Sequence, residues 1–197
     1  MTELRGTRAV VTGAGSGLGR ALARELGRRG ARVMVADINL ASAEATRDTL
    51  AGGPHAAVAC DVAQRAQVEA MARAADEHLG GVDVLINNAG VAVAGDVGAV
   101  SPEDWAWIVG VNLWGVIHGC EVFGPRLREQ RRGWILNVAS MAGLVGVAKM
   151  GPYCATKFAV VGLSECLHAE LAPANVAVSV LCPSVFQTSI AANGRAT

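Results

Sequence analysis

The amino-acid sequence predicts an α/β fold built on a doubly wound parallel sheet. Short β-rich runs alternate along the chain with longer runs of helical pattern, which implies right-handed β–α–β crossovers. The β-rich runs are almost continuously apolar, as expected for strands that helices cover on both faces. The 197 residues, 52% hydrophobic and 17% charged, fit a single domain over 1–197. We expect six strands in the order 3-2-1-4-5-6.

Each expected element follows from a local pattern. The strands are the short apolar runs at 9–11, 32–37, 56–61, 82–88, 134–140 and 176–183. The helices are the longer runs between them, at 18–29, around 40–50, 64–78, 103–123 and 153–171. Gly30 ends the first helix, and the pair Gly80 and Gly81 ends the third. Ser101, followed by Pro102 and two acidic residues, is a good start for the fourth helix.

Composition excludes several classes of function. The formal net charge is zero and there is no basic tract, so we expect no nucleic-acid partner. The five cysteines form no CxxC, and the four histidines have no metal-ligand spacing. We interpret the cysteines as small buried side chains in a reduced compartment. The N-terminus is not a signal peptide, and no uninterrupted apolar run of about 18 residues suggests a membrane span. A soluble, cytoplasmic protein is therefore expected.

A glycine-rich loop, TGAGSGLG at 12–19, follows the first strand and opens a helix. Gly13, Gly17 and Gly19 allow a tight turn, close approach of the backbone to a phosphate and close helix–strand packing. The backbone N–H groups and the helix dipole then face a pyrophosphate. A purely structural turn is the alternative, but the flanking strand and helix are those that a dinucleotide-binding loop requires.

Two carboxylates end the next two strands. Asp37 can accept hydrogen bonds from both ribose hydroxyls of an adenosine and would repel a 2′-phosphate, which favours NAD over NADP. No arginine stands at Ser16 or Ile38 to offset that repulsion, although Arg20 could reach. A solvated carboxylate is the alternative for Asp37. Asp61 either meets the adenine amino group or serves as a helix N-cap.

Other polar groups are expected at the same edge of the sheet. The segment NNAG at 87–90 could tie adjacent loops together and contact the cofactor, or form only a strand-end turn. Ser140 ends the fifth strand, and Tyr153 and Lys157 open the following helix with a spacing that places them on one face. A lysine ammonium or an oxidised nicotinamide would favour the phenolate of a nearby tyrosine. Hydride transfer from an alcohol needs such a base, whereas an isolated Tyr–Lys pair would more often be structural.

Together these motifs resemble the compact, single-domain branch of the short-chain dehydrogenase/reductase family, which has a Rossmann fold and the patterns TGxxxGxG and YxxxK. The resemblance implies that Tyr153 is the general acid/base, Lys157 binds the nicotinamide ribose and lowers the tyrosine pKa, and Ser140 positions the substrate oxygen. Asn112, in VNLWG, would hold a water of a proton relay, with a helix kink or cap as its alternative role.

The same resemblance assigns residues to the cofactor along the whole chain. They are Gly13, Ser16, Gly17, Leu18, Gly19, Asp37, Ile38, Asp61, Val62, Asn88, Ala89, Gly90, Tyr153, Lys157, Pro183, Phe186 and Thr188. One departure is Ser184, which stands where the family usually has glycine after the proline, and this leaves the path of that loop open. A second is the end of the sequence at Thr197, before the substrate-covering loop and seventh strand that family members usually have.

These features imply an NAD-dependent oxidoreductase acting on a secondary alcohol or its ketone. Residues expected near the substrate, or else in packing, are Ala142, Gly143, Leu144, Val145 and Trp114, which weakly suggest an apolar substrate. The competing hypothesis is a dinucleotide-binding regulator or scaffold without turnover. A homodimer or homotetramer is expected from the family, in which the apolar helices at 103–123 and 153–171 commonly pair across a two-fold axis.

Overall fold

The structure, a computed structural model, describes residues 4–184 and 194–196. Its main sheet has six parallel strands in the order β3-β2-β1-β4-β6-β7, which confirms the predicted doubly wound topology. These strands are β1 (Arg8–Thr12), β2 (Arg32–Asp37), β3 (Ala56–Ala59), β4 (Val84–Asn87), β6 (Gly133–Val138) and β7 (Val176–Leu181). The order reverses between β1 and β4, and a crevice forms at such a switch point in open α/β sheets.

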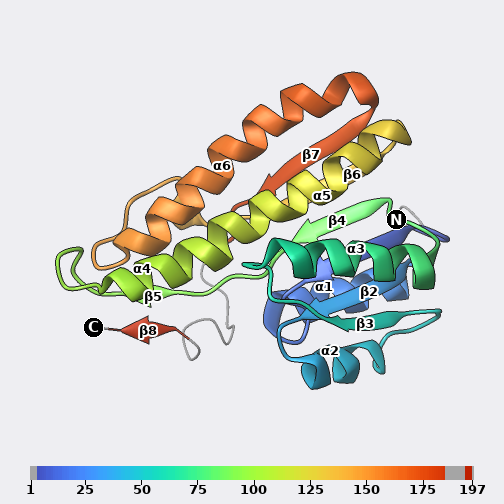
Figure 1. The fold of residues 1–197 in the computed structure, drawn as a ribbon, viewed down its shortest axis with the longest axis horizontal. Helices are drawn as coiled ribbons and strands as arrows, with labels where there is room; N and C mark the ends of the chain where they lie inside the picture. Colours follow the sequence, from blue (N-terminus) through green and yellow to red (C-terminus); the bar gives the residue numbers. More distant parts are fainter. Residues whose placement is uncertain (1–3, 185–193, 197) are drawn as a thin grey trace.

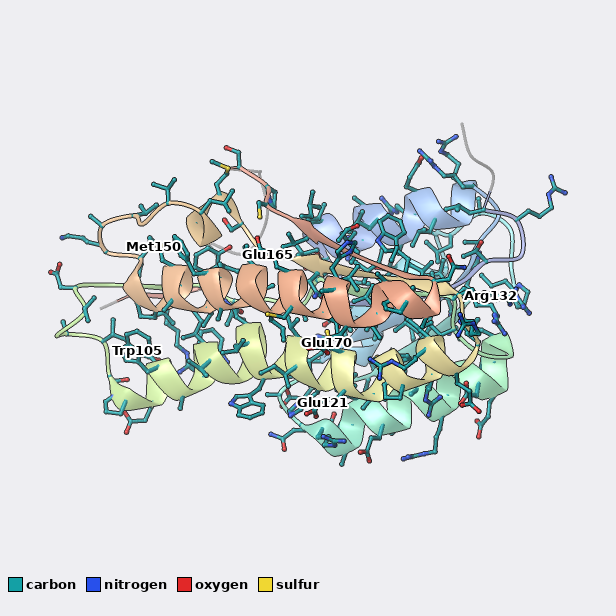
Figure 2. All side chains as sticks on the ribbon, turned by 90° about the horizontal axis from the view of Figure 1, so that it is seen from above. Trp105, Glu121, Arg132, Met150, Glu165 and Glu170 are labelled. Carbon is teal, nitrogen blue, oxygen red and sulfur yellow. The ribbon has the colours of Figure 1, made fainter. Side chains whose placement is uncertain are left out.

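Helices cover both faces of the sheet. They are α1 (Gly17–Arg28), α2 (Leu40–Arg47), α3 (Arg65–Leu79), α4 (Pro102–Val109), α5 (Gly115–Glu129) and α6 (Gly151–Leu171), with 3₁₀ turns η2 (Met141–Gly143) and η3 (Ala172–Ala174). Figure 1 shows α3, α5 and α6 on one side of the strands and α1 and α2 on the other. Figure 2, turned by a right angle, shows α6 alongside the α4–α5 helix, in agreement with the contacts between them.

The two faces of the sheet form separate cores, which explains the continuous apolar strands. In β1, Val10 packs in the core under α3, α5 and α6, whereas Ala9 and Val11 pack in the core under α1 and α2. Neighbouring side chains of a strand point to opposite faces, so a sheet buried on both faces needs apolar residues at every position. The arrowheads of β3, β4 and β7 all point towards the same edge of the sheet in Figure 1, where the carboxyl ends of the parallel strands lie.

The helix expected at 103–123 is longer and less regular than predicted. Ser101 caps its start by accepting a hydrogen bond from the Asp104 N–H at 3.1 Å, as expected. Between α4 and α5, however, the chain forms a π-helical turn, η1 (Gly110–Trp114), and the helix continues to Glu129. By length and composition, Pro102–Glu129 is the one described helix that could cross a membrane. Here it packs against α3, α6 and the sheet, and core helices of soluble proteins meet the same test.

Two details were not predicted. Beside the main sheet, β5 (Val93–Ala94) pairs in parallel with β8 (Arg195–Ala196), and these pairs are too short to leave a pattern in the sequence. The cysteines are also less uniformly buried than expected. Cys60, Cys120 and Cys154 are buried, but Cys166 is exposed because it lies on the face of α6 opposite the buried Ser164.

Candidate active site

The predicted glycine loop closes tightly against the start of α1. Gly13 has φ of 61° and Gly17 has φ of 49°, a backbone conformation that side chains with a Cβ rarely adopt. At Gly19 the backbone angles are ordinary, but an added Cβ would lie 2.3 Å from the Gly13 carbonyl oxygen. The first N–H groups of α1 therefore lie directly behind the loop, with Ser16 exposed as the N-cap residue and Leu18 partly buried. Such a helix start is suited to an anion.

The segment after β4 is fastened to this loop. The Asn88 amide donates from Nδ2 to the carbonyl oxygens of Thr12 at 2.8 Å and Gly13 at 3.2 Å. The Thr12 hydroxyl in turn accepts from the N–H groups of Asn88 at 3.0 Å and Ala89 at 3.1 Å. Asn88 thus ties two loops together, as one of the two interpretations of NNAG proposed. Asn87 points elsewhere, into the core, where its Nδ2 donates to Asn137 Oδ1 at 2.9 Å.

Asp37 lies at the end of β2 and faces the glycine loop. Its Oδ2 accepts from the Gly15 N–H at 2.8 Å and its Oδ1 from the Asn39 N–H at 3.0 Å. A carboxylate has about four lone-pair sites, so both oxygens can accept further hydrogen bonds. Arg20 does reach this region, but its guanidinium donates to the Gly15 carbonyl and, from Nε at 3.0 Å, to Thr46 Oγ1. The Ile38 side chain beside Asp37 is 73% exposed.

Asp61 follows β3 and is not the N-cap of the next helix. That position belongs to Gln64, whereas Asp61 Oδ1 accepts from the Ala63 N–H at 3.0 Å in the turn before it. The neighbouring Val62 is buried, and its carbonyl oxygen lies 3.0 Å from His118 Nδ1 on α5. The turn that carries Asp61 and Val62 is therefore held against α5 at the edge of the site.

Ser140 and Tyr153 come together as their spacing along the chain required. Ser140 follows β6 and its Oγ accepts from the Ala142 N–H at 3.1 Å, which caps the short turn η2. The Tyr153 phenol lies close enough to Ser140 for the serine side chain to act on its pKa. The pKa of Tyr153 is raised above its usual value, chiefly because burial disfavours the phenolate, while the Ser140 side chain acts in the opposite direction. In the protein alone, Lys157 does not produce the lowered pKa that the resemblance implied.

Lys157 is the most deeply buried charged group of the cluster, with 3% of its surface exposed. Its Nζ donates to the Val138 carbonyl oxygen at 2.9 Å and lies 5.6 Å from the centre of the Tyr153 ring. Burial lowers the pKa of Lys157 to about 8. Gly90 borders the ammonium, since a Cβ added there would lie 3.6 Å from Nζ. Tyr153 and Lys157 therefore share one face of α6, with Gly90 of the NNAG segment opposite the ammonium.

Asn112 lies fully buried within the π-helical turn. Its Oδ1 accepts from the Val91 N–H at 2.8 Å, and its Nδ2 donates to the Val91 carbonyl at 2.9 Å and to Thr156 Oγ1 at 3.2 Å. Both amide hydrogens are thus engaged by protein atoms. A water bound at Asn112 would have to hydrogen-bond to the remaining acceptor sites of the Asn112 side chain or to the Asn112 backbone. Thr156 was not among the predicted site residues, although a hydroxyl directly before Lys157 in an apolar helix was a visible signal.

The remaining predicted positions divide into three groups. The Pro183 carbonyl accepts from the Met141 N–H at 2.9 Å, which places the end of β7 beside Ser140. Phe186 and Thr188 lie outside the described residues. On the expected substrate side, Ala142 and Gly143 are buried in packing, whereas the side chains of Leu144, Val145 and Trp114 are half or more exposed. Within the described ranges, no cluster of three His, Cys, Asp or Glu side chains could hold a metal ion.

Comparisons with known proteins agree with this geometry. A family model for short chain dehydrogenases matches residues 7–197. The chain is 40% identical over 190 residues to D-threitol dehydrogenase of Mycolicibacterium smegmatis, covering 95% of this chain and 73% of that protein. It is 39% identical over 181 residues to meso-2,3-butanediol dehydrogenase of Serratia marcescens, covering 92% and 72%. A short chain dehydrogenase/reductase from Burkholderia phymatum, solved in complex with NAD, superposes with a TM-score of 0.94 at 44% identity, covering 98% and 70%.

Proposed function

The chain belongs to the short-chain dehydrogenase family, and on that premise we propose that it transfers a hydride between a secondary alcohol or its ketone and NAD(H). One observation carries the proposal. A partly buried tyrosine, a serine close enough to act on the pKa of that tyrosine, and a buried lysine meet at the carboxyl edge of the sheet, next to a loop suited to a dinucleotide phosphate. Binding alone would not need a phenol held beside an ammonium.

In this proposal each residue of the cluster has a separate task. Bound nicotinamide supplies or accepts the hydride. Ser140 hydrogen-bonds the substrate oxygen and orients it towards Tyr153. Because its pKa is raised, Tyr153 is a neutral phenol near pH 7 in the protein alone, which suits it to donate a proton to a ketone oxygen. In the oxidation direction it must accept the alcohol proton, and the positive charges of Lys157 and of oxidised nicotinamide then favour the phenolate.

Lys157 and Asn112 complete the proton path. The Lys157 ammonium, with a pKa of about 8, can hydrogen-bond the nicotinamide ribose and exchange a proton near neutral pH. Since both amide hydrogens of Asn112 are engaged by Val91 and Thr156, we propose that this residue holds a relay water through an acceptor atom. Gly90 has no side chain to compete for the Lys157 ammonium, from which an added Cβ would lie 3.6 Å away.

We propose NAD rather than NADP as the cofactor. The support is Asp37, whose carboxylate faces Gly15 of the phosphate loop with acceptor sites to spare for the adenosine ribose. Arg20, a cation in this region that could neutralise a 2′-phosphate, is already held by Gly15 and Thr46. Asp61 and Val62 would border the adenine, while Gly13, Ser16, Gly17, Leu18 and Gly19 would surround the pyrophosphate.

The assembly and location of the protein are proposed from the same features. A groove of about 500 Å³ runs between α5 and α6, with Ile117, Leu163 and Leu167 among its apolar walls. A second copy pairing there would bury this surface, and we propose a homodimer or homotetramer. We also propose a soluble, cytoplasmic protein with the site contained in one domain, since the apolar helix Pro102–Glu129 packs against α3, α6 and the sheet.

Substitution of Tyr153 by phenylalanine tests the function directly. Wild-type and Tyr153→Phe proteins are assayed for oxidation of a set of alcohols with NAD. The set contains apolar secondary alcohols and the diols threitol and 2,3-butanediol, which the relatives' names specify. Because general acid–base catalysis contributes about 10²- to 10⁴-fold, Tyr153→Phe should lower kcat by that order while NAD binding, measured calorimetrically, stays within about threefold. A wild-type protein that binds NAD but oxidises none of these alcohols would instead favour a regulator or scaffold without turnover.

A further inference from the structure

Helix α6 carries two buried hydroxyl groups that make nearly the same local contacts. Thr156 and Ser164 are each 2% exposed. Thr156 Oγ1 donates to the Tyr153 carbonyl at 2.8 Å, and Ser164 Oγ donates to the Val160 carbonyl at 2.6 Å. Each hydroxyl also accepts from an asparagine amide, from Asn112 Nδ2 at 3.2 Å and from Asn137 Nδ2 at 3.0 Å respectively. Both therefore couple the helix to another element through a buried hydrogen bond.

The two hydroxyls differ in what they are coupled to. Through Asn137 and Asn87, Ser164 joins a buried polar network that reaches Cys120 of α5. Thr156 joins the first turns of α6 to the π-helical turn through Asn112, and Asn112 holds Val91, next to Gly90, with two more hydrogen bonds. Only the Thr156 connection runs from the backbone of Tyr153 to the segment that borders the Lys157 ammonium.

The start of α6 needs such a connection. Tyr153 is the third residue of the helix, and the N-cap residue Met150 provides no side-chain hydrogen bond to the first turn. Pro152 has no N–H to contribute. Helix ends fray unless side chains or tertiary contacts hold them, so the position of Tyr153 depends on contacts made from outside the helix. Removing the Thr156 hydroxyl would also leave one buried Asn112 N–H without its partner.

We propose that Thr156 is a positioning residue for the reaction: its hydroxyl locks the turn bearing Tyr153 and Lys157 onto the π-helical turn at Asn112. The role of Thr156 in catalysis rests on the proposed oxidoreductase function. The effect of Thr156 on the position and burial of the Tyr153 phenol is independent of that function, because it exists in the protein alone. Thr156 would act through Tyr153 and Lys157 without touching the substrate.

The test compares Thr156→Val, which keeps the shape but loses the hydroxyl, with Thr156→Ser, which keeps the hydroxyl. Ser164→Ala is the matched control, since it removes the equivalent hydroxyl two turns along the same helix. We expect kcat to fall about tenfold in Thr156→Val while KM for alcohol and NAD changes less than threefold. Thr156→Ser should restore kcat to within threefold, and Ser164→Ala should lower the melting temperature but leave kcat within threefold.

A second measurement needs no substrate, because Tyr153 is the single tyrosine of the chain. Its ionisation can be followed by the ultraviolet absorbance of the phenolate. Loosening the first turn admits water, so the pKa of Tyr153, raised by burial, should fall towards its ordinary value in Thr156→Val but not in Thr156→Ser or Ser164→Ala. Unchanged titration and unchanged kcat in Thr156→Val would overturn the proposal. A shifted titration in a protein without turnover would uphold the positioning of Tyr153 and refute only the oxidoreductase function.

Discussion

Asp37 is the residue on which the choice of cofactor depends. Replacing it with alanine removes a carboxylate that would accept the ribose hydroxyls and repel a 2′-phosphate. Hydrogen bonds to a charged group contribute about 1.5–3 kcal/mol, so NAD should bind about 10- to 100-fold more weakly to Asp37→Ala. The preference for NAD over NADP should narrow by a similar factor. Dissociation constants for both dinucleotides, measured by calorimetry or fluorescence, check this expectation.

A matched control for this change is Asp48→Ala. Asp48 is an exposed carboxylate at the C-terminal end of α2 that pairs with Arg47 and makes no hydrogen bond to the glycine loop among those described. Its removal changes the net charge by the same amount and should leave the ratio of NAD to NADP affinity unaltered. A wild-type protein that already prefers NADP would show that the assignment of Asp37 is wrong, and Arg20 would then be the next residue to test.

For single residues, the sequence predicted which chemical groups form the site better than it predicted the burial and contacts of those groups. Spacing alone indicated that Ser140, Tyr153 and Lys157 could meet, because strand ends and a helical i, i+4 pair have known geometry. The raised pKa of Tyr153 and the lowered pKa of Lys157 arise from desolvation by residues distant in sequence, which local patterns do not reveal. The Thr156 hydroxyl is visible in the sequence, but its bond to Asn112 joins residues 44 positions apart, so the local pattern did not show what Thr156 contacts.

At the scale of elements, the strand–loop–helix unit at the N-terminus is packed too closely to accept a Cβ at Gly19. A Cβ at Gly19 would lie 2.5 Å from Asn88 Nδ2 as well as close to the Gly13 carbonyl, so Gly19→Ala must displace the loop or the helix. Overpacking of this kind costs about 1–3 kcal/mol. We expect Gly19→Ala to lower the melting temperature and to weaken NAD binding at least about tenfold, as differential scanning fluorimetry and calorimetry would measure.

Gly162 in α6 is the control for that substitution. It is an exposed helical glycine, and an added Cβ would meet no atom within 4 Å. Alanine has the higher helix propensity by about 1 kcal/mol, so Gly162→Ala should stabilise the protein slightly and leave NAD binding unchanged. Equal effects of the two substitutions would contradict the close packing of the glycine loop against α1 and Asn88.

The elements that the sequence predicted well are those with long, repeated signals. Six apolar runs separated by helical patterns led to the observed strand order, because parallel strands require right-handed crossovers. The π-helical turn was predicted only as part of one regular helix. It inserts a residue into the helical repeat around Asn112, whose amide bonds to Val91 and Thr156 are tertiary contacts. An apolar pattern of helical period cannot show where such contacts interrupt it.

For the molecule as a whole, the site places a buried charge beside an apolar core. The sheet has one core under α1 and α2 and another under α3, α5 and α6, and the Lys157 ammonium enters the edge of the second with a carbonyl as its hydrogen-bond partner. Desolvation of an ammonium disfavours folding as long as the group stays protonated. The fold therefore bears a free-energy penalty at neutral pH for the group that the proposed chemistry requires.

This penalty predicts how stability depends on pH. The pKa of Lys157 is about 8 in the folded protein against about 10.5 when unfolded, so the unfolded state binds more protons between these values and stability rises with pH there. Below pH 8 the penalty is fully present. Relative to Lys157→Met, the wild-type protein without cofactor should gain about 1 kcal/mol of unfolding free energy between pH 7 and pH 9. Urea denaturation of both proteins at a series of pH values measures the difference.

Comparison with Lys157→Met is needed because other buried groups titrate in the alkaline range. Burial raises the pKa of Cys60 to about 12 and of Cys120 to about 11, so both thiols favour the folded state less as the pH rises above their ordinary value near 9. These contributions occur in both proteins and cancel in the difference. Parallel stability curves for the two proteins from pH 7 to pH 9 would mean that Lys157 keeps an ordinary pKa, and the buried ammonium would then not oppose folding.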